Sequence, residues 1–260
     1  MGRQPRPIAD GLLYHGLNRG NNRRPVFFAE ADYRAFLRAL AQTQQRYPFR
    51  LFGYCLMTNH FHLLLQPDDG VSISRVLQSL TVAHTWHSHR AHGSVGHVWQ
   101  GRFKSPVVQD DDHALTVLRY LEANPLRAGM VTDLADYPWS SSPAHGLGRA
   151  DPLLRGLPSG KGRWATEPQR RRWWRAWVQA PLTEKQLAAV RRSVTSGRPY
   201  GEAAWARGVV ERLGLRCSER GRPRPQASRA QQQINELTPF SPTNSGMGKH
   251  GREDALGSDR

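Results

Sequence analysis

Residues 49–66 read FRLFGYCLMTNHFHLLLQ, and this stretch decides the fold. It holds two runs of aromatic and aliphatic residues, 49–57 and 61–66, with the polar residues 58–60 between them. Runs of this length and composition, bounded by polar residues, are typical of neighbouring strands joined by a tight connection. We therefore predict that these residues form two strands of a sheet, linked by a hairpin-like turn.

The segments on either side of this pair predict a small mixed domain. From Glu30 to Tyr47 apolar residues recur at helical spacing, which predicts an amphipathic helix, and a second helix is expected at about 72–89. The order β-α-β-β-α-β-α indicates an α+β domain with helices on one face of the sheet, compatible with a ferredoxin-like layout. The remaining expected elements are a strand at 11–17, a strand at 102–109 and a helix from Asp110–Asp112 to about Ala123, ended by Pro125.

The composition of the chain changes along its 260 residues, of which 38% are hydrophobic. We predict a compact domain at 1–148, followed at 149–217 by a basic, Trp-rich accessory region with helices at 182–194 and 200–213. From about Ser218 large apolar residues become scarce, which predicts a disordered tail at 218–260.

The charge balance points to a polyanionic partner. Lys and Arg number 37 against 21 Asp and Glu, giving a formal net charge of +16. A basic surface of this kind binds nucleic acid by releasing counterions from its phosphates; a solvated surface without a partner is the alternative. No apolar run is long enough to cross a bilayer, and the two cysteines, Cys55 and Cys217, form no CxxC pattern. These features favour a cytoplasmic protein without a membrane partner.

The sharpest local motif is His60-Phe61-His62. Residues two apart in a strand point to the same face, so the two imidazoles can converge on one divalent cation while Phe61 turns into the core. The alternative is a pair of hydrogen-bonded histidines on a half-exposed strand, because two ligands alone do not define a metal site. The motif by itself leaves both interpretations open.

Tyr120 and Asn124 lie four residues apart near the end of the third predicted helix, and they therefore share one face. Together they offer a nucleophilic hydroxyl and an amide oxygen that could complete a metal site with the histidines. The alternatives are a tyrosine of the core and an asparagine that ends a helix before Pro125. Nothing in the spacing shows that this helix packs beside the strand of His60 and His62.

Several ordered motifs resemble those of the REP-associated tyrosine transposases, a single-tyrosine branch of the HUH endonucleases. The resemblance covers about residues 11–145, and a weaker one extends over 196–215. The segment 84–97 departs from it, because histidines stand where tyrosine and asparagine are more typical. The motifs are RGNNRRPVFF at 19–28, YCLMTNHFHLLL at 54–65, WQGRFKS at 99–105, RYLEANPLRAGMV at 119–131 and DYPWSS at 136–141.

This resemblance implies a ferredoxin-like domain in which His60 and His62 bind Mg²⁺ or Mn²⁺. It implies Asn124 as a third ligand and Tyr120 as the nucleophile that cuts single-stranded or hairpin DNA through a 5′-phosphotyrosine intermediate. The protein would then be a transposase in the bacterial cytoplasm, associated with the nucleoid. The alternative is a domesticated, non-catalytic DNA-binding protein. Whether the chain acts as a monomer or a homodimer stays open.

Other clusters carry weaker hypotheses. We assign five arginines to contacts with the DNA backbone. The histidines of 84–97 suggest a zinc site, but no cysteine or acidic partner is near them in the sequence, which favours a solvated helix face. Arg170–Trp174 is either a stacking platform for single strands or part of a small core, and Arg220–Pro223 is either a minor-groove hook or a basic tail. The five arginines are Arg19, Arg23, Arg24, Arg102 and Arg127.

Overall fold

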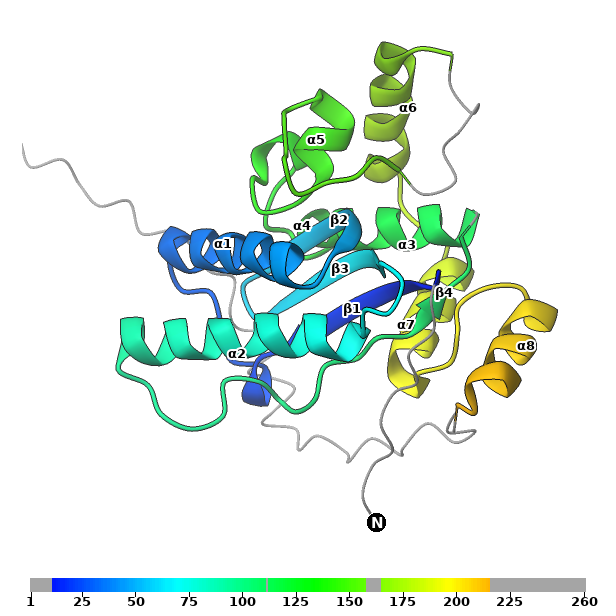
Figure 1. The fold of residues 1–260 in the computed structure, drawn as a ribbon. Coiled ribbons are helices and arrows are strands. Elements are labelled where there is room, and N and C mark those ends of the chain that lie inside the picture. Colours follow the sequence, from blue (N-terminus) through cyan, green and yellow to red (C-terminus); the bar gives the residue numbers. More distant parts are fainter. Residues whose placement is uncertain (1–10, 111, 158–164, 216–260) are drawn as a thin grey trace, which may run out of the picture. The chain divides into compact units, whose positions relative to one another are not determined.

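The strand pair predicted at residues 49–66 forms one side of a four-stranded sheet. The computed structural model describes residues 11–110, 112–157 and 165–215. Within them the sheet order is β2-β3-β1-β4, and all neighbouring strands are antiparallel (Figure 1). The strands are β1 (Leu13–Arg19), β2 (Phe49–Met57), β3 (His60–Pro67) and β4 (Val107–Val108).

Two long helices connect the strands. Helix α1 (Glu30–Arg46) joins β1 to β2, and α2 (Ile73–His92) joins β3 to β4. Each connection skips one strand, because β3 lies between β1 and β2, and β1 lies between β3 and β4. Two interleaved βαβ units of this kind make up the ferredoxin-like layout. The predicted α+β, ferredoxin-like fold is therefore confirmed, although the last strand is much shorter than the predicted 102–109.

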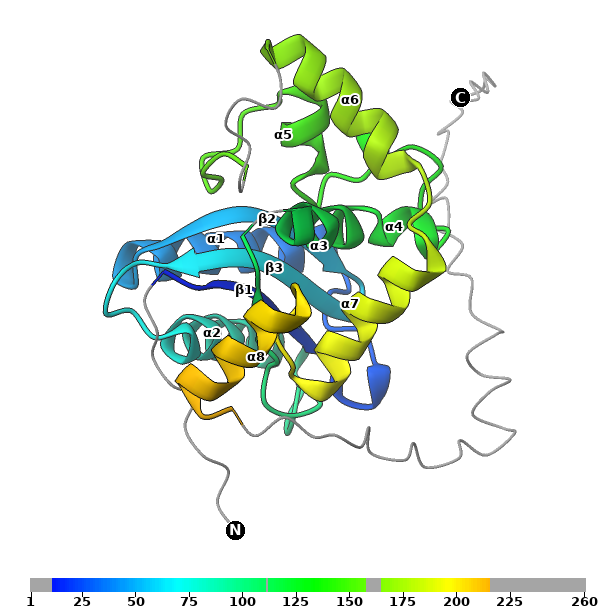
Figure 2. The same ribbon diagram turned by 90° about the vertical axis from the view of Figure 1, so that its right-hand side faces the viewer.

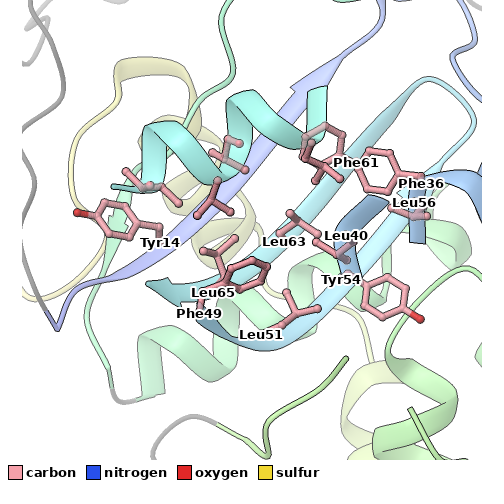
Figure 3. Packing of buried hydrophobic residues seen from close by; sticks show 14 of the residues in the cluster. Tyr14, Phe36, Leu40, Phe49, Leu51, Tyr54, Leu56, Phe61, Leu63 and Leu65 are labelled. Atoms are coloured by element: carbon pink, nitrogen blue, oxygen red, sulfur yellow. The ribbon is translucent and has the colours of Figure 1, made fainter. Parts of the chain in front are cut away.

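The first face of the sheet carries the larger core. Phe61, Leu63 and Leu65 of β3 are fully buried and belong to one apolar cluster with residues of α1 and α2 (Figure 3). In strand β2, Leu51 and Tyr54 both face this core although they are three residues apart, because the register of the strand shifts between Leu51 and Gly53. A bulge of this kind adds one residue to one strand and so resets the alternation of its side chains.

The second face of the sheet is also covered by a helix, and here the sequence prediction was wrong. Helix α3 (Asp112–Glu122) packs on β2 and β3, and its apolar residues share a second core cluster with Leu64 and Cys55. Figures 1 and 2 show α1 and α2 on one side of the sheet and α3 on the other. Strands buried on both faces read as nearly continuous apolar runs, and FRLFGYCLM is such a run.

The approach of α3 to the sheet is close at Gly53. A Cβ atom on this residue would lie 2.2 Å from Leu118 Cδ1 and 2.8 Å from Ser141 Oγ. Only a glycine leaves this space, and the contact brings the end of α3 within reach of the side chains on β3.

The C-terminal helices belong to the same cores. The Trp-rich segment is helical, and Trp174 is fully buried in the second cluster together with Val178 and Val190. Of the two interpretations of Arg170–Trp174, the core is the one observed for Trp174. Residues from both sides of position 148 share this cluster. The predicted domain boundary at residue 148 stays a prediction. The remaining elements are η1 (Asn21–Arg23), α4 (Asn124–Arg127), η2 (Leu134–Asp136), α5 (Ser142–Leu147), α6 (Glu167–Gln179), α7 (Glu184–Ser196) and α8 (Ala203–Leu213).

The segment before α8 extends the sheet. The N–H of Tyr200 donates to Val107 O at 2.8 Å, and the N–H of Gln109 donates to Tyr200 O at 2.9 Å. Val209 of α8 is buried in the first core cluster. The predicted helices at 182–194 and 200–213 are therefore confirmed and lie against the domain. The tail from Ser218, with Cys217 and Arg220–Pro223, lies outside the described residues. No helix of the described part is both long and apolar enough to span a bilayer.

A buried carboxylate ties these parts together. Glu122, at the end of α3, has no exposed surface. Its oxygens accept hydrogen bonds from Ser141 Oγ at 2.5 Å, His145 Nδ1 at 2.6 Å and Trp174 Nε1 at 2.7 Å. Ser141 Oγ in turn accepts from the backbone N–H of Tyr54 in β2 at 3.1 Å. The sheet, α3, α5 and α6 therefore meet at one side chain.

We expect Trp174→Phe to destabilise the protein by about 1–3 kcal/mol, because it leaves one oxygen of a buried carboxylate without its donor. Chemical denaturation measures this change in unfolding free energy. Trp86→Phe is the matched control, since Trp86 is 73% exposed and its replacement should change stability by less than about 0.5 kcal/mol. Equal stabilities for the two variants would show that Glu122 does not depend on the indole N–H.

Candidate active site

Three aromatic side chains meet where α3 crosses the second face of the sheet. His62 of β3 and His15 of β1 are both buried, and His15 Nε2 lies 2.9 Å from His62 Nδ1. The ring of Tyr120, from α3, packs edge-on against both, with centroid distances of 5.8 Å to His62 and 6.1 Å to His15. Helix α3 therefore places its tyrosine beside the strand of the HFH motif, which the sequence alone did not establish.

His60 lies at the start of β3, on the same side as His62. The centroids of the two rings are 5.0 Å apart and the rings are nearly perpendicular. His60 Nδ1 is 2.6 Å from Asn59 Oδ1, so this nitrogen is the donor and Nε2 keeps its lone pair. Phe61, between the two histidines, turns to the opposite face and packs on Phe36. The alternation predicted for the motif is therefore confirmed.

The buried imidazoles of this site favour their neutral forms. Burial lowers the pKa of His15 to about 3. Burial, with a smaller contribution from the charge of Arg19, lowers the pKa of His60 to about 4. The pKa of His62 is also well below 6.5, mainly because of burial. Neutral imidazoles carry the lone pair that a metal ion needs, so this pocket suits cation binding at neutral pH.

Arg127 of α4 joins Tyr120 to Asn124. Its guanidinium lies 4.5 Å from the centroid of the Tyr120 ring, and Nη2 donates to Tyr120 O at 2.7 Å. The same nitrogen donates to Asn124 Oδ1 at 2.6 Å. The Nδ2 atom of Asn124 is buried and has no hydrogen-bond partner among the described residues. Asn124 therefore lies beside the tyrosine as predicted, but its amide oxygen is engaged by the arginine.

The other predicted arginines lie on β1 and on segments linked to β1 or to the β2–β3 connection. Arg19 ends β1 directly across from His60, and it donates to Gln100 Oε1 at 3.1 Å. The turn that carries Arg23 and Arg24 is tied to the β2–β3 connection, because Asn59 Nδ2 donates to Arg23 O at 2.9 Å. Arg102 is exposed in the segment that pairs with β1 through Lys104. The segments that carry these arginines are thus linked by backbone contacts to the strands of His15 and His60.

The tight turn after β1 depends on Gly20. A Cβ atom there would lie 2.2 Å from Arg24 O and 2.8 Å from Val26 Cγ1. Asn22 and Arg23 both adopt positive φ angles, 50° and 60°, in the same turn. The turn therefore needs glycine for space, and Arg23 is the arginine that adopts the left-handed conformation in it, while Arg24 is extended.

Sequence reasoning missed His15. Strand β1 reads LYHGLNR, in which Tyr14 is in the first core cluster and Leu13 in the second. By alternation, His15 shares the face of Leu13, which is also the face of α3. The feature that could have indicated His15 is a histidine in a strand whose two faces are both buried. Tyr137, another tyrosine of the second core cluster, is buried and donates its hydroxyl to Leu56 O at 2.5 Å.

The comparisons with known proteins can now be placed on this geometry. A family model described as "Transposase IS200 like" matches residues 9–124. Residues 9–124 are therefore similar to the IS200-like transposases. The match contains the HFH motif and ends at Asn124, so it spans the candidate site.

One curated relative belongs to the group that the sequence resembles. It is a REP-associated tyrosine transposase of Haemophilus influenzae (strain Rd), 28% identical over 116 residues, which are 41% of this chain and 66% of the relative. The chain thus spans slightly less than two thirds of that relative. The resemblance to the REP-associated tyrosine transposases is confirmed.

Two solved structures resemble part of this chain weakly. One is a REP-associated tyrosine transposase bound to a REP hairpin, with 19% identity, a TM-score of 0.49, and coverage of 60% of this chain and 92% of that one. The other is a transposase from Deinococcus radiodurans R1, with 19% identity, a TM-score of 0.34, and coverage of 46% and 96%.

We expect the metal-free protein to lose stability in acid, because its buried histidines stay neutral while those of the unfolded chain titrate near 6.5. Stability is fully present above pH 6.5 and falls as the pH is lowered toward 3. His15→Gln keeps a hydrogen-bonding side chain beside His62 but cannot take up a proton, so its unfolding free energy should fall less steeply.

Urea unfolding between pH 7.5 and 4, in the presence of a chelator, measures this dependence. His89→Gln, which alters a histidine that is only partly buried, should reproduce the wild-type curve. An identical slope for His15→Gln and the wild type would show that the burial of His15 does not contribute to the acid sensitivity.

Proposed function

We propose that the protein is a metal-dependent transposase that cuts and rejoins single-stranded DNA, with Tyr120 as its nucleophile. The observation that carries this proposal is the packing of the half-buried Tyr120 ring against His62 and His15, at 5.8 and 6.1 Å. The contact of the Tyr120 ring with two buried imidazoles supports a role in the site beyond packing in the core. Tyr33, Tyr54 and Tyr137 are buried, and burial is the largest cause that raises their pKa values.

The side chains present fit a divalent metal ion. His60 and His62 are neutral, each has one ring nitrogen engaged by a neighbour, and each keeps its other nitrogen for a ligand bond. Asn59 and His15 would fix the ring orientations, as outer-shell partners of metal-binding histidines do. Bound there, Mg²⁺ or Mn²⁺ would supply positive charge to the oxygens of the scissile phosphate. Asn124 is proposed as the third ligand.

The amide of Asn124 must change partners for this role. Its oxygen accepts from Arg127 Nη2 at 2.6 Å, and its nitrogen is buried without a partner among the described residues. We propose that DNA binding draws the Arg127 guanidinium toward the phosphate, which frees the Asn124 oxygen. Arginine suits this exchange, because its planar fork matches the geometry of phosphate oxygens.

The reaction follows from these positions. The phenolic oxygen of Tyr120 would attack the phosphorus in line, forming a Tyr–O–P bond as the bond to the 3′-oxygen breaks. The tyrosine releases its proton, the departing 3′-oxygen gains one, and the 5′ end stays on the protein. The Arg127 cation, 4.5 Å from the ring centroid, would stabilise the developing phenolate. Because one phosphodiester replaces another, rejoining to a second 3′-hydroxyl needs no ATP.

The proposed substrate is single-stranded DNA that carries a hairpin, as the resemblance to the REP-associated group suggests. The exposed residues Arg23, Arg24 and Arg102, with Arg19 and Arg127, would hold its backbone around the pocket. The net charge of +16 adds a general attraction for phosphate, which should weaken as salt is raised.

Tyr120→Phe tests the nucleophile. With Mn²⁺ or Mg²⁺ and a labelled hairpin oligonucleotide, the wild type should form an adduct that survives denaturing electrophoresis, and the variant should form none. Tyr33→Phe is a matched control, since the hydroxyl it removes belongs to the core. If the wild type binds the hairpin but forms no adduct with either metal, the protein is the non-catalytic DNA-binding alternative.

His60→Ala separates chemistry from binding. We expect the cleavage rate to fall by about 100-fold or more, because the scissile phosphate loses the metal ion that His60 would help to bind. Hairpin affinity, measured by fluorescence anisotropy, should change by less than about threefold, since binding is spread over many arginines. Wild-type cleavage by the variant at limiting metal would remove His60 from the ligand set.

A further inference from the structure

A second group of ligand-type side chains lies on the other face of the sheet, where α1 begins and α2 ends. Asp32 of α1 accepts through Oδ1 from His87 Nε2 at 2.7 Å and from His92 Nε2 at 2.9 Å. One ligand atom from each of the three residues lies within 4.8 Å of the other two. The expectation that the histidines of 84–97 have no acidic partner was therefore wrong, because Asp32 is remote in sequence and adjacent in space.

The carboxylate of Asp32 is held in one orientation. Its side chain is 1% exposed, and Oδ2 accepts from the backbone N–H groups of Phe28 at 2.7 Å and Ala29 at 3.0 Å. Burial raises the pKa of this carboxyl, but its hydrogen bonds outweigh burial and lower the pKa to about 2. One ionised oxygen is thus fixed by the backbone, and the other is directed at the two imidazoles.

We propose that Asp32, His87 and His92 form a second metal site, selective for Zn²⁺ and separate from the HFH pair. Two imidazoles and one carboxylate oxygen are a donor set that suits zinc and related transition metals, whereas Mg²⁺ prefers oxygen ligands throughout. The side chains of His87 and His92 are 27% and 29% exposed, which leaves a fourth position open to water.

The geometry needs only a small adjustment. Ligand atoms on a tetrahedral zinc ion lie roughly 3.3 Å apart, given bonds of about 2.0–2.1 Å. The two imidazole nitrogens are now within hydrogen-bond distance of Asp32 Oδ1, so each ring would withdraw by about half an ångström. Both histidines are partly exposed side chains near the end of a helix, where such a movement meets little resistance.

His84, one helical turn before His87, supports the proposal. It is 1% exposed, and its Nε2 lies 2.8 Å from Val26 O, which makes this nitrogen the donor. Its Nδ1 is buried without a hydrogen-bond partner among the described residues, and its ring centroid is 6.0 Å from that of His87. The Nδ1 atom of His84 therefore has a lone pair without a donor close to the proposed site. A water molecule bound to the metal ion could donate a hydrogen bond to it.

The proposed ion would fasten the end of α2 to the start of α1. His92 is the last residue of α2, and the chain beyond it returns to β1, where the N–H of Gln100 donates to Arg19 O at 2.8 Å. Zinc at this site would therefore stabilise the loop that leads to Arg102. Its role is structural, and it does not depend on the proposed cleavage reaction.

The test uses full-length protein stripped of metal and the double variant His60→Ala/His62→Ala, which removes the other imidazole pair. Titration calorimetry with Zn²⁺ should show one ion bound per chain, and the melting temperature should rise by several degrees. Mg²⁺ at the same concentration should give neither effect. Adding His87→Gln should weaken zinc binding by at least about tenfold, whereas adding His89→Gln should leave it unchanged.

A cysteine replacement gives a readout that a folding defect cannot imitate. His87→Cys should bind Co²⁺ with a thiolate charge-transfer band in the near ultraviolet, because the sulfur takes the place of the imidazole nitrogen. If the double variant does not fold, the wild type should bind two Zn²⁺ ions and His92→Gln only one. The proposal is overturned if zinc binding is unchanged in both His87→Gln and His92→Gln, or if the double variant folds and binds no zinc.

Discussion

Glu122 is a carboxylate buried in the apolar contact between α3 and the sheet, and a charge in such a place is unfavourable unless its oxygens are paired. Three donors pair them, from Ser141, His145 and Trp174. These donors come from two segments of the chain, residues 141–145 and α6, and both must be in place before the carboxylate is satisfied. This requirement fixes the last turn of α3, and with it Tyr120, which lies two residues before Glu122.

The candidate site follows from that constraint. The glycine at position 53 lets α3 approach β2, and the buried carboxylate holds it there, so that the Tyr120 ring comes to lie against His62 and His15. The sheet contributes imidazoles that burial keeps neutral, and α4 contributes the cation of Arg127. The hydroxyl proposed as nucleophile, the side chains proposed as metal ligands and the cation proposed to bind phosphate are therefore gathered by packing that is itself independent of DNA.

The parts of this arrangement that sequence could predict are those with a local period. The apolar runs of residues 49–57 and 61–66, bounded by polar residues, indicated the strand pair. The two-residue period of a strand indicated the facing of His60 and His62, and helical spacing indicated α1 and α2. Contacts between remote segments left no such signal. Neither the packing of α3 on the second face, nor the pairing of His15 with His62, nor that of Asp32 with His87 could be inferred, because each joins residues more than forty positions apart. The roles assigned to Tyr120, Asn124 and the arginines stay predictions.

The central claim is that Tyr120 carries the 5′ end of the cut strand. The most direct measurement is mass spectrometry of the protein after incubation with hairpin DNA and Mn²⁺, followed by exhaustive nuclease and protease digestion. The account predicts a nucleotide attached to the peptide that contains Tyr120 and to no other tyrosine peptide. A nucleotide on the peptide of Tyr137 or of any other residue, together with an unmodified Tyr120 in protein that has cut its substrate, would contradict it.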